Sequence, residues 1–141
     1  MKKNPLLEEA NAIAASVYEI ADVIEAELPD EKWRTVSKLK GAANDAYFYV
    51  AQVAGAGQNQ AFEFDCVNAQ KYLNTVKAMY IFAAKQGMTE LDPELVVKID
   101  KLVAETDAAW AASQKETKRK TEEDLRPWLE KYRIWQKISN D

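Results

Sequence analysis

The side chains that most often carry chemistry are scarce in this sequence. It contains no histidine and a single cysteine, Cys66, among 141 residues. Composition therefore excludes a histidine general base, a Ser-His-Asp triad and the usual zinc ligand sets. A carboxylate-bridged di-iron bundle is excluded as well, because its helices supply Glu-x-x-His pairs. We predict that the protein is not an enzyme and that it holds no metal or cofactor.

The remaining motifs that could bind a small ligand have structural interpretations. Cys66 lies in a predicted helix without a basic neighbour at one-turn spacing, so it is interpreted as a small buried hydrophobic side chain. The Gly-Ala-Gly segment at residues 55–57 lacks the preceding strand of a phosphate loop, and we predict a helical-hairpin turn there. Glu63 and Asp65 are two residues apart on a helix, point to different sides, and are interpreted as solvated charges.

Basic residues form the first candidate binding group. Those at residues 115–120 are either an ordinary charged helix end or a patch that contacts phosphates. The net charge of −4 argues against avid, nonspecific binding of nucleic acid, because that affinity comes mainly from phosphate neutralisation. The candidate contacts to RNA or DNA are Lys38, Lys40, Lys115, Lys118, Arg119 and Lys120.

Aromatic residues form the second candidate group. A stripe near the C-terminus, flanked by basic residues, contains the residue types that anchor protein interfaces. This stripe either packs on its own bundle or on a sister subunit, or it binds a different partner protein. The consecutive residues Tyr47, Phe48 and Tyr49 cannot all face one core, which favours a homo-oligomer. The candidate partner-binding residues are Tyr47, Tyr49, Trp128, Tyr132, Arg133 and Trp135.

Apolar residues at spacings of three and four predict an all-α protein. The predicted helices cover about residues 5–28, 30–54, 59–86 and 93–113. Asn4 and Asp92, each followed by proline, are predicted N-caps, Gly87 is a predicted C-cap, and Trp33 is predicted to begin the inner face of the second helix. Short breaks between the helices favour antiparallel neighbours. The predicted fold is an antiparallel up-and-down four-helix bundle with an additional C-terminal helix.

The last part of the chain differs in composition. Residues 115–124 contain no apolar side chain and are either a continuation of the fourth helix or a flexible joint. A fifth helix is predicted from Asp124, with Pro127 in its first turn, where proline is tolerated. We therefore expect a four-helix bundle over residues 1–114 and a charged joint with an aromatic and basic helix over residues 115–141.

Sequence features also predict where the protein works. No apolar run approaches the ~20 residues that span a bilayer, and no signal peptide is evident, so no membrane partner is expected. A single cysteine excludes an internal disulfide and fits a reducing compartment. The expected location is the cytoplasm.

Several segments resemble a known family. The Leu-Lys-Gly-Ala-Ala segment at residues 39–43, running on to Val-Ala-Gly at 53–55, is similar to a basic-Ala-Ala helix and its small-residue ending. These features occur in the four-helix-bundle proteins named for intervening sequences in large ribosomal RNA genes. Residues 62–87 resemble their third helix, and the Leu-Pro-Asp-Glu-Lys-Trp segment at 28–33 resembles their first interhelix turn. The resemblance covers about residues 7–112.

This resemblance carries expectations about assembly and partners. The family includes the accessory variability determinant of diversity-generating retroelements. The resemblance implies a homopentameric barrel with a central channel, binding to RNA or DNA, and a partnership with reverse transcriptase. The expected function is a non-catalytic oligomeric scaffold or accessory factor. The alternatives are a nucleic-acid-binding protein that uses the basic patches and an interaction protein of another pathway.

Overall fold

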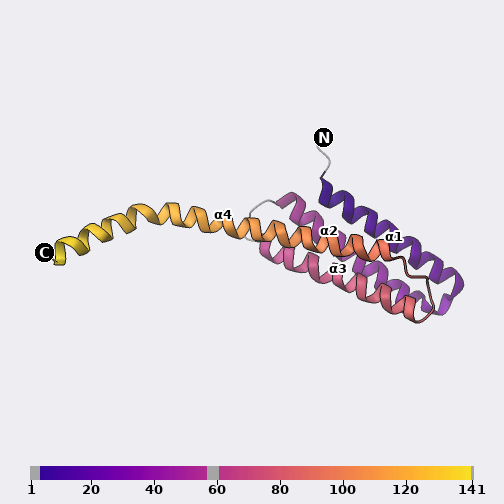
Figure 1. Cartoon of the computed structure of the whole chain (residues 1–141). Coiled ribbons are helices and arrows are strands. Elements are labelled where there is room, and N and C mark those ends of the chain that lie inside the picture. The colour runs from indigo at the N-terminus through magenta and orange to yellow at the C-terminus, as the bar shows by residue number, and fades with distance from the viewer. Residues whose placement is uncertain (1–3, 57–60, 141) are drawn as a thin grey trace. The chain divides into compact units, whose positions relative to one another are not determined.

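The structure is a computed structural model in which residues 4–56 and 61–140 are described, and every regular element within them is a helix. The α-helices are α1 (Pro5–Glu27), α2 (Ser37–Ala56), α3 (Phe62–Lys85) and α4 (Pro93–Asn140). A 3-10 turn, η1 (Pro29–Glu31), and a π-helical turn, η2 (Lys32–Val36), precede α2. In Figure 1, α1, α2, α3 and the first part of α4 lie side by side. The predicted all-α class is confirmed for this part of the chain.

Local capping explains where three of these helices begin or end. The Asn4 side-chain oxygen accepts hydrogen bonds from the backbone N–H groups of Leu6, at 3.0 Å, and Leu7, at 3.4 Å. The Asp92 carboxylate accepts one from Glu94 N–H at 3.0 Å. Gly87 has a φ of 77°, a conformation that costs glycine little, and it follows the last turn of α3. These three predicted caps are confirmed. The predicted hairpin turn includes Gly57, which lies outside the described residues.

The chain divides into two compact units, Met1–Trp110 and Ala111–Asp141. The first unit has one hydrophobic core to which all four α-helices contribute. Apolar side chains at helical spacing on α3 are buried, as the periodicity of the sequence indicates: Phe62, Cys66, Leu73, Val76, Tyr80 and Ala83. On α4, Leu95, Ile99, Leu102 and Thr106 are buried.

Two predictions about individual side chains are wrong. Trp33 was expected on the inner face but is 79% exposed. It belongs to η2, whose wider π-helical turn breaks the 3.6-residue period on which the prediction rested, and the core face begins at Val36. Asp65 was expected in solvent but is buried, whereas Glu63 is exposed. Asp65 lies in the first turn of α3, where the helix dipole stabilises a carboxylate.

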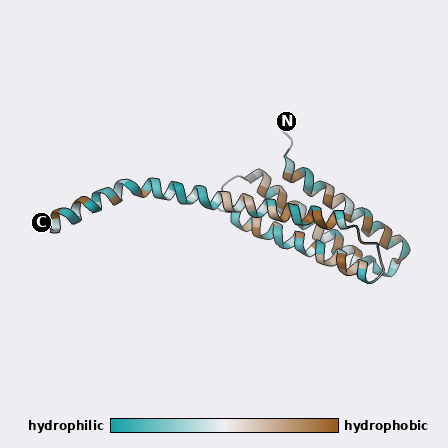
Figure 2. Cartoon of the chain, in the orientation of Figure 1, coloured by the Kyte–Doolittle hydropathy of each residue, from teal (hydrophilic) through white to brown (hydrophobic). Residues whose placement is uncertain are grey.

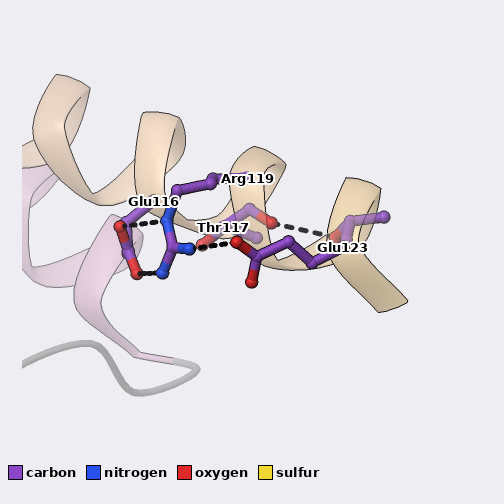
Figure 3. Close-up of polar contacts among 5 residues, drawn as sticks. Glu116, Thr117, Arg119 and Glu123 are labelled. Atoms are coloured by element: carbon purple, nitrogen blue, oxygen red, sulfur yellow. Dashed lines mark hydrogen bonds and ion pairs between the residues drawn. The ribbon is translucent and has the colours of Figure 1, made fainter. Parts of the chain in front are cut away.

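Of the two alternatives for residues 115–124, the continuation of the fourth helix is confirmed, because α4 runs without a break to Asn140. The prediction of a separate fifth helix is wrong. Arg119 explains part of this continuity. Its guanidinium binds Glu116 one turn before it and Glu123 one turn after it, at 2.6 Å and 2.5 Å (Figure 3). Such pairs stabilise a solvated stretch of helix that, like residues 115–124, has no apolar side chain. Pro127 lies inside the helix and removes one backbone donor without ending it.

Tyr80 connects the core to the turn between α3 and α4. The side chain is 1% exposed, its hydroxyl donates to the Glu90 carbonyl at 3.0 Å, and the hydroxyl oxygen accepts from Asp92 N–H at 2.6 Å. We expect Tyr80→Phe to lower the free energy of unfolding by about 1–3 kcal/mol, because it leaves these backbone groups without their partner. Chemical denaturation measures the change. The control is Tyr18→Phe, which removes an exposed hydroxyl bonded to Asn44; an equal loss in both variants would contradict the prediction.

Candidate interaction surfaces

Four aromatic side chains of α2 and α3 form a continuous cluster, here named the Tyr49 patch: Phe48, Tyr49, Phe64 and Tyr72. The Tyr49 ring stacks on Tyr72, with centroids 5.5 Å apart and planes 5° from parallel. It meets Phe48 edge to face at 5.1 Å and Phe64 at 6.1 Å. Aromatic contacts of this kind contribute about 0.5–1.5 kcal/mol each beyond area burial. The patch is therefore held in one arrangement by both helices.

The Tyr49 patch leaves much apolar surface in solvent. Phe48 is 53% exposed, Phe64 is 60% exposed, and Val67, one turn beyond Phe64, is 50% exposed. Clustered exposed aromatics on an ordered surface are typical of an interface. The consecutive aromatics diverge as expected, since Phe48 faces outward while Tyr49 is half-buried. Tyr47 lines a different depression, between α1 and α2.

A second aromatic surface lies on the part of α4 in the second unit, here named the C-terminal stripe: Leu125, Trp128, Tyr132 and Trp135. Steps of three and four residues place these side chains on one helix face. Trp128 is 69% exposed and Trp135 is 62% exposed, and the Tyr132 and Trp135 rings stack at 6.1 Å. Figure 2 shows this stretch of α4 as mainly hydrophilic with separate hydrophobic positions.

Basic side chains surround the C-terminal stripe. Lys131 Nζ lies 5.2 Å from the centre of the Trp128 ring, a cation–π distance. The predicted contact Arg133 is exposed in the same helical segment. Every side chain described between residues 117 and 139 is exposed, so this stretch of the second unit has no core of its own.

The predicted nucleic-acid contacts fall into two groups. Lys38 and Lys40 lie on α2 in the first unit, whereas the other four lie on α4 in the second. Lys40 binds Asp22 at 2.6 Å, and this hydrogen bond raises the pKa of the lysine. Its charge is thus locally balanced.

The charge of Arg119 is balanced by carboxylates in the same way. It hydrogen-bonds both oxygens of Glu116, which lowers the pKa of that carboxyl, and it also binds Glu123 (Figure 3). Within residues 4–56 and 61–140, no ion pair is formed by Lys38, Lys115, Lys118 or Lys120. These four lysines are the predicted contacts that form no ion pair within the described residues, although the charge of Lys120 also acts on Glu116.

A carboxylate pair between α1 and α4 was not predicted from the sequence. Lys101 Nζ lies 3.3 Å from Glu9 and 3.7 Å from Glu105. The second carboxylate oxygen of Glu9 is buried without a hydrogen-bond partner. Protonated Glu105 can donate a hydrogen bond to Glu9, and this, followed by burial and the Glu9 charge, raises the pKa of Glu105, although Lys101 opposes the shift. No local sequence signal joins residues so far apart in the chain.

This pair predicts a pH-dependent contribution to stability. A raised folded-state pKa means that Glu105 favours folding below the ordinary value of 4.5, and this contribution is lost as the pH rises through the folded pKa. We expect Glu105→Gln to raise the free energy of unfolding at pH 7, because it removes a carboxylate charge beside Glu9. The gain should be only roughly 0.5 kcal/mol, since solvent screens the two charges. Urea denaturation should show a smaller gain at pH 4. A gain that does not change with pH would contradict this interpretation.

Cys66 behaves as the sequence indicates. Its side chain is fully buried, and burial, helped by the charges of Asp65 and Asp107, raises the pKa of the thiol to about 11. The thiol therefore stays protonated at neutral pH, which favours a packing role.

Two other kinds of site are absent from the described residues. No group of three or more histidine, cysteine, aspartate or glutamate side chains is placed to hold a metal ion among them. No helix in the described ranges combines the length and the apolar character needed to cross a membrane.

Comparison with known proteins finds no family model, no curated protein and no solved structure that matches this chain. The resemblance to the intervening-sequence proteins therefore stays a prediction.

Proposed function

We propose that this protein is a non-catalytic oligomeric scaffold of the cytoplasm that presents its C-terminal helical segment to a macromolecular partner. The observation that carries the proposal is the C-terminal stripe. It places two tryptophans and a tyrosine, each more than half exposed, on a helix that has no core within its unit. Isolated helices are marginal in water, and packing of an apolar face supplies most helical stability. A partner that covers the stripe would supply that packing.

For the first unit, we propose an antiparallel up-and-down four-helix bundle. Contacts between helix ends support this topology for α1 and α2. The Asn4 side chain, at the start of α1, donates to the Ala54 carbonyl near the end of α2 at 3.3 Å. Asp22, near the end of α1, binds Lys40 near the start of α2. For α3 and α4, the Tyr80 contact with Asp92 joins the end of one helix to the start of the next.

Self-association is proposed to use the Tyr49 patch. Its rigid aromatic surface belongs to the folded first unit, so a second copy can bury it at little cost in side-chain ordering. The pentameric form, and reverse transcriptase of a diversity-generating retroelement as the partner, are proposed on the resemblance alone.

Co-expression of two tagged forms of the full chain tests self-association. One copy would carry a hexahistidine tag and the other a streptavidin-binding tag. We expect purification on the second tag to retain the first copy in a fixed ratio. Recovery of the second copy alone, at the same expression level, would contradict the oligomeric scaffold.

Nucleic-acid binding is the alternative function, and local ion pairing makes it the weaker one. Two of its six predicted contacts, Lys40 and Arg119, already bind carboxylates of this chain. Fluorescence anisotropy with labelled single-stranded RNA and duplex DNA at low salt separates the two functions. The scaffold proposal predicts no saturable binding. Binding that weakens steeply with salt would favour phosphate contacts instead.

Hydrogen exchange distinguishes the two possible occupants of the C-terminal stripe. If a sister subunit covers it, amides of residues 125–138 should be protected in the pure protein, because an unpacked helix opens readily. If it serves a different partner, these amides should exchange rapidly while those of α3 stay protected. We expect rapid exchange.

A further inference from the structure

A groove in the first unit has no role in the proposed assembly. It is open to solvent, has a volume of about 580 Å³, and runs between the η2–α2 segment and α3. This volume lies within the range of roughly 300–1,000 Å³ that is usual for binding sites. The lining residues are Glu31, Arg34, Thr35, Lys38, Ala78, Met79, Phe82 and Met88.

Half of the residues that line this groove are apolar, and they are adaptable. Met79 and Met88 contribute flexible thioether side chains, which fit surfaces of varied shape. Phe82 is 56% exposed and provides the large apolar contact area. A trough between two helices that is lined by methionine and phenylalanine suits an amphipathic helix that lays down its apolar face.

The rim of the groove carries positive charge. Arg34 and Lys38 are four residues apart, and in the described part of the chain neither has an acidic partner. One carboxylate oxygen of Glu31 accepts a hydrogen bond from the Thr35 hydroxyl at 2.8 Å. The groove lining therefore has two cations that form no ion pair among the described residues and one carboxylate, so its net charge is positive although the chain as a whole is acidic. Charge complementarity selects an acidic occupant.

The backbone at the groove is irregular. The π-helical turn η2 supplies Arg34 and Thr35 to its wall, and π-helical turns occur frequently at functional sites. The same turn leaves Trp33, the sequence neighbour of Arg34, 79% exposed. An open trough, rather than an enclosed cavity, favours a polypeptide segment over a small molecule.

We infer that this groove binds an acidic amphipathic helix of a partner protein, with an apolar side chain on Phe82 and carboxylates on Arg34 and Lys38. The inference is independent of self-association through the Tyr49 patch, which involves different residues. It provides the scaffold with a second attachment point besides the C-terminal stripe.

The probe is a fluorescein-labelled helical peptide of about 15 residues, alanine-based, with leucines at i, i+4 spacing on one face and glutamates beside them. Fluorescence anisotropy with the full-length protein should show saturable binding that weakens with salt. A matched peptide with lysines in place of the glutamates should bind at least about tenfold more weakly. Equal binding of the two peptides, or no binding of either, would overturn the inference.

Variants locate the bound peptide. Arg34→Glu/Lys38→Glu and, separately, Phe82→Ser should each weaken binding of the acidic peptide by about tenfold or more. The control is Lys118→Glu/Lys120→Glu, which changes the net charge equally but lies in the second unit and should leave affinity unchanged. An equal effect of the two double variants would overturn the inference. If the fatty acid dodecanoate binds and the peptide does not, the inference is overturned in favour of a small amphiphile. If a second copy of the chain covers the groove and excludes the peptide, the inference is overturned as well.

Discussion

Replacing Phe48 and Phe64 together by serine is expected to dissociate the assembly, with self-association weakened about a hundredfold or more. Both rings are more than half exposed in the isolated chain and contact Tyr49 at the centre of the patch. Buried aromatic anchors contribute roughly 2 kcal/mol or more each to an interface, and 1.4 kcal/mol is a tenfold change. Sedimentation velocity over a range of concentrations measures the shift to monomer.

The control for this variant is Val97→Ser on α4, which removes a side chain that is 63% exposed and outside the patch. It should leave sedimentation unchanged. Far-ultraviolet circular dichroism and thermal unfolding should show that all three forms of the protein are folded, since surface substitutions usually change stability by about 0.5 kcal/mol or less. Wild-type sedimentation of the double variant would exclude the Tyr49 patch as the interface.

Leu73→Ala is expected to lower the free energy of unfolding of the first unit by about 2–5 kcal/mol. Leu73 is 1% exposed in the middle of α3, within the core to which all four helices contribute. Truncation there loses the transfer free energy of the removed methyl groups and leaves a cavity. Because oligomers have concentration-dependent stability, the comparison belongs in the Phe48→Ser/Phe64→Ser background.

The matched control is Val23→Ala on α1, at a position that is 50% exposed. Its effect should stay within about 0.5 kcal/mol. A loss below about 1 kcal/mol for Leu73→Ala would indicate that the core around α3 is loosely packed, contrary to this structure. Urea denaturation followed by circular dichroism gives both values.

Sequence periodicity predicts the inner face of α3 well, because that helix is regular from its first core residue to its last. The same reasoning fails at Trp33, where a π-helical turn alters the residue period before α2. It does not decide between a helix and a joint at residues 115–124, because that segment has no apolar side chain and ion pairs around Arg119 stabilise the helix there. Apolar periodicity thus predicts helices that face a core, but it does not predict helical segments that are stabilised by ion pairs.

The candidate surfaces show a similar division. Consecutive aromatics at residues 47–49 already indicate that one ring must leave the core, and the spacing of Trp128, Tyr132 and Trp135 already places them on one face. The Tyr49 patch as a whole could not be predicted, because it joins Tyr49 to Phe64 and Tyr72 on another helix. The carboxylate pair Glu9 and Glu105 likewise depends on packing between α1 and α4.

The measurement that tests the central proposal most directly is the mass of the pure full-length protein by sedimentation equilibrium at physiological salt. We predict a single assembly larger than the monomer, at five times the monomer mass if the resemblance to the intervening-sequence proteins extends to assembly. A monomer throughout the accessible concentration range would contradict the oligomeric scaffold.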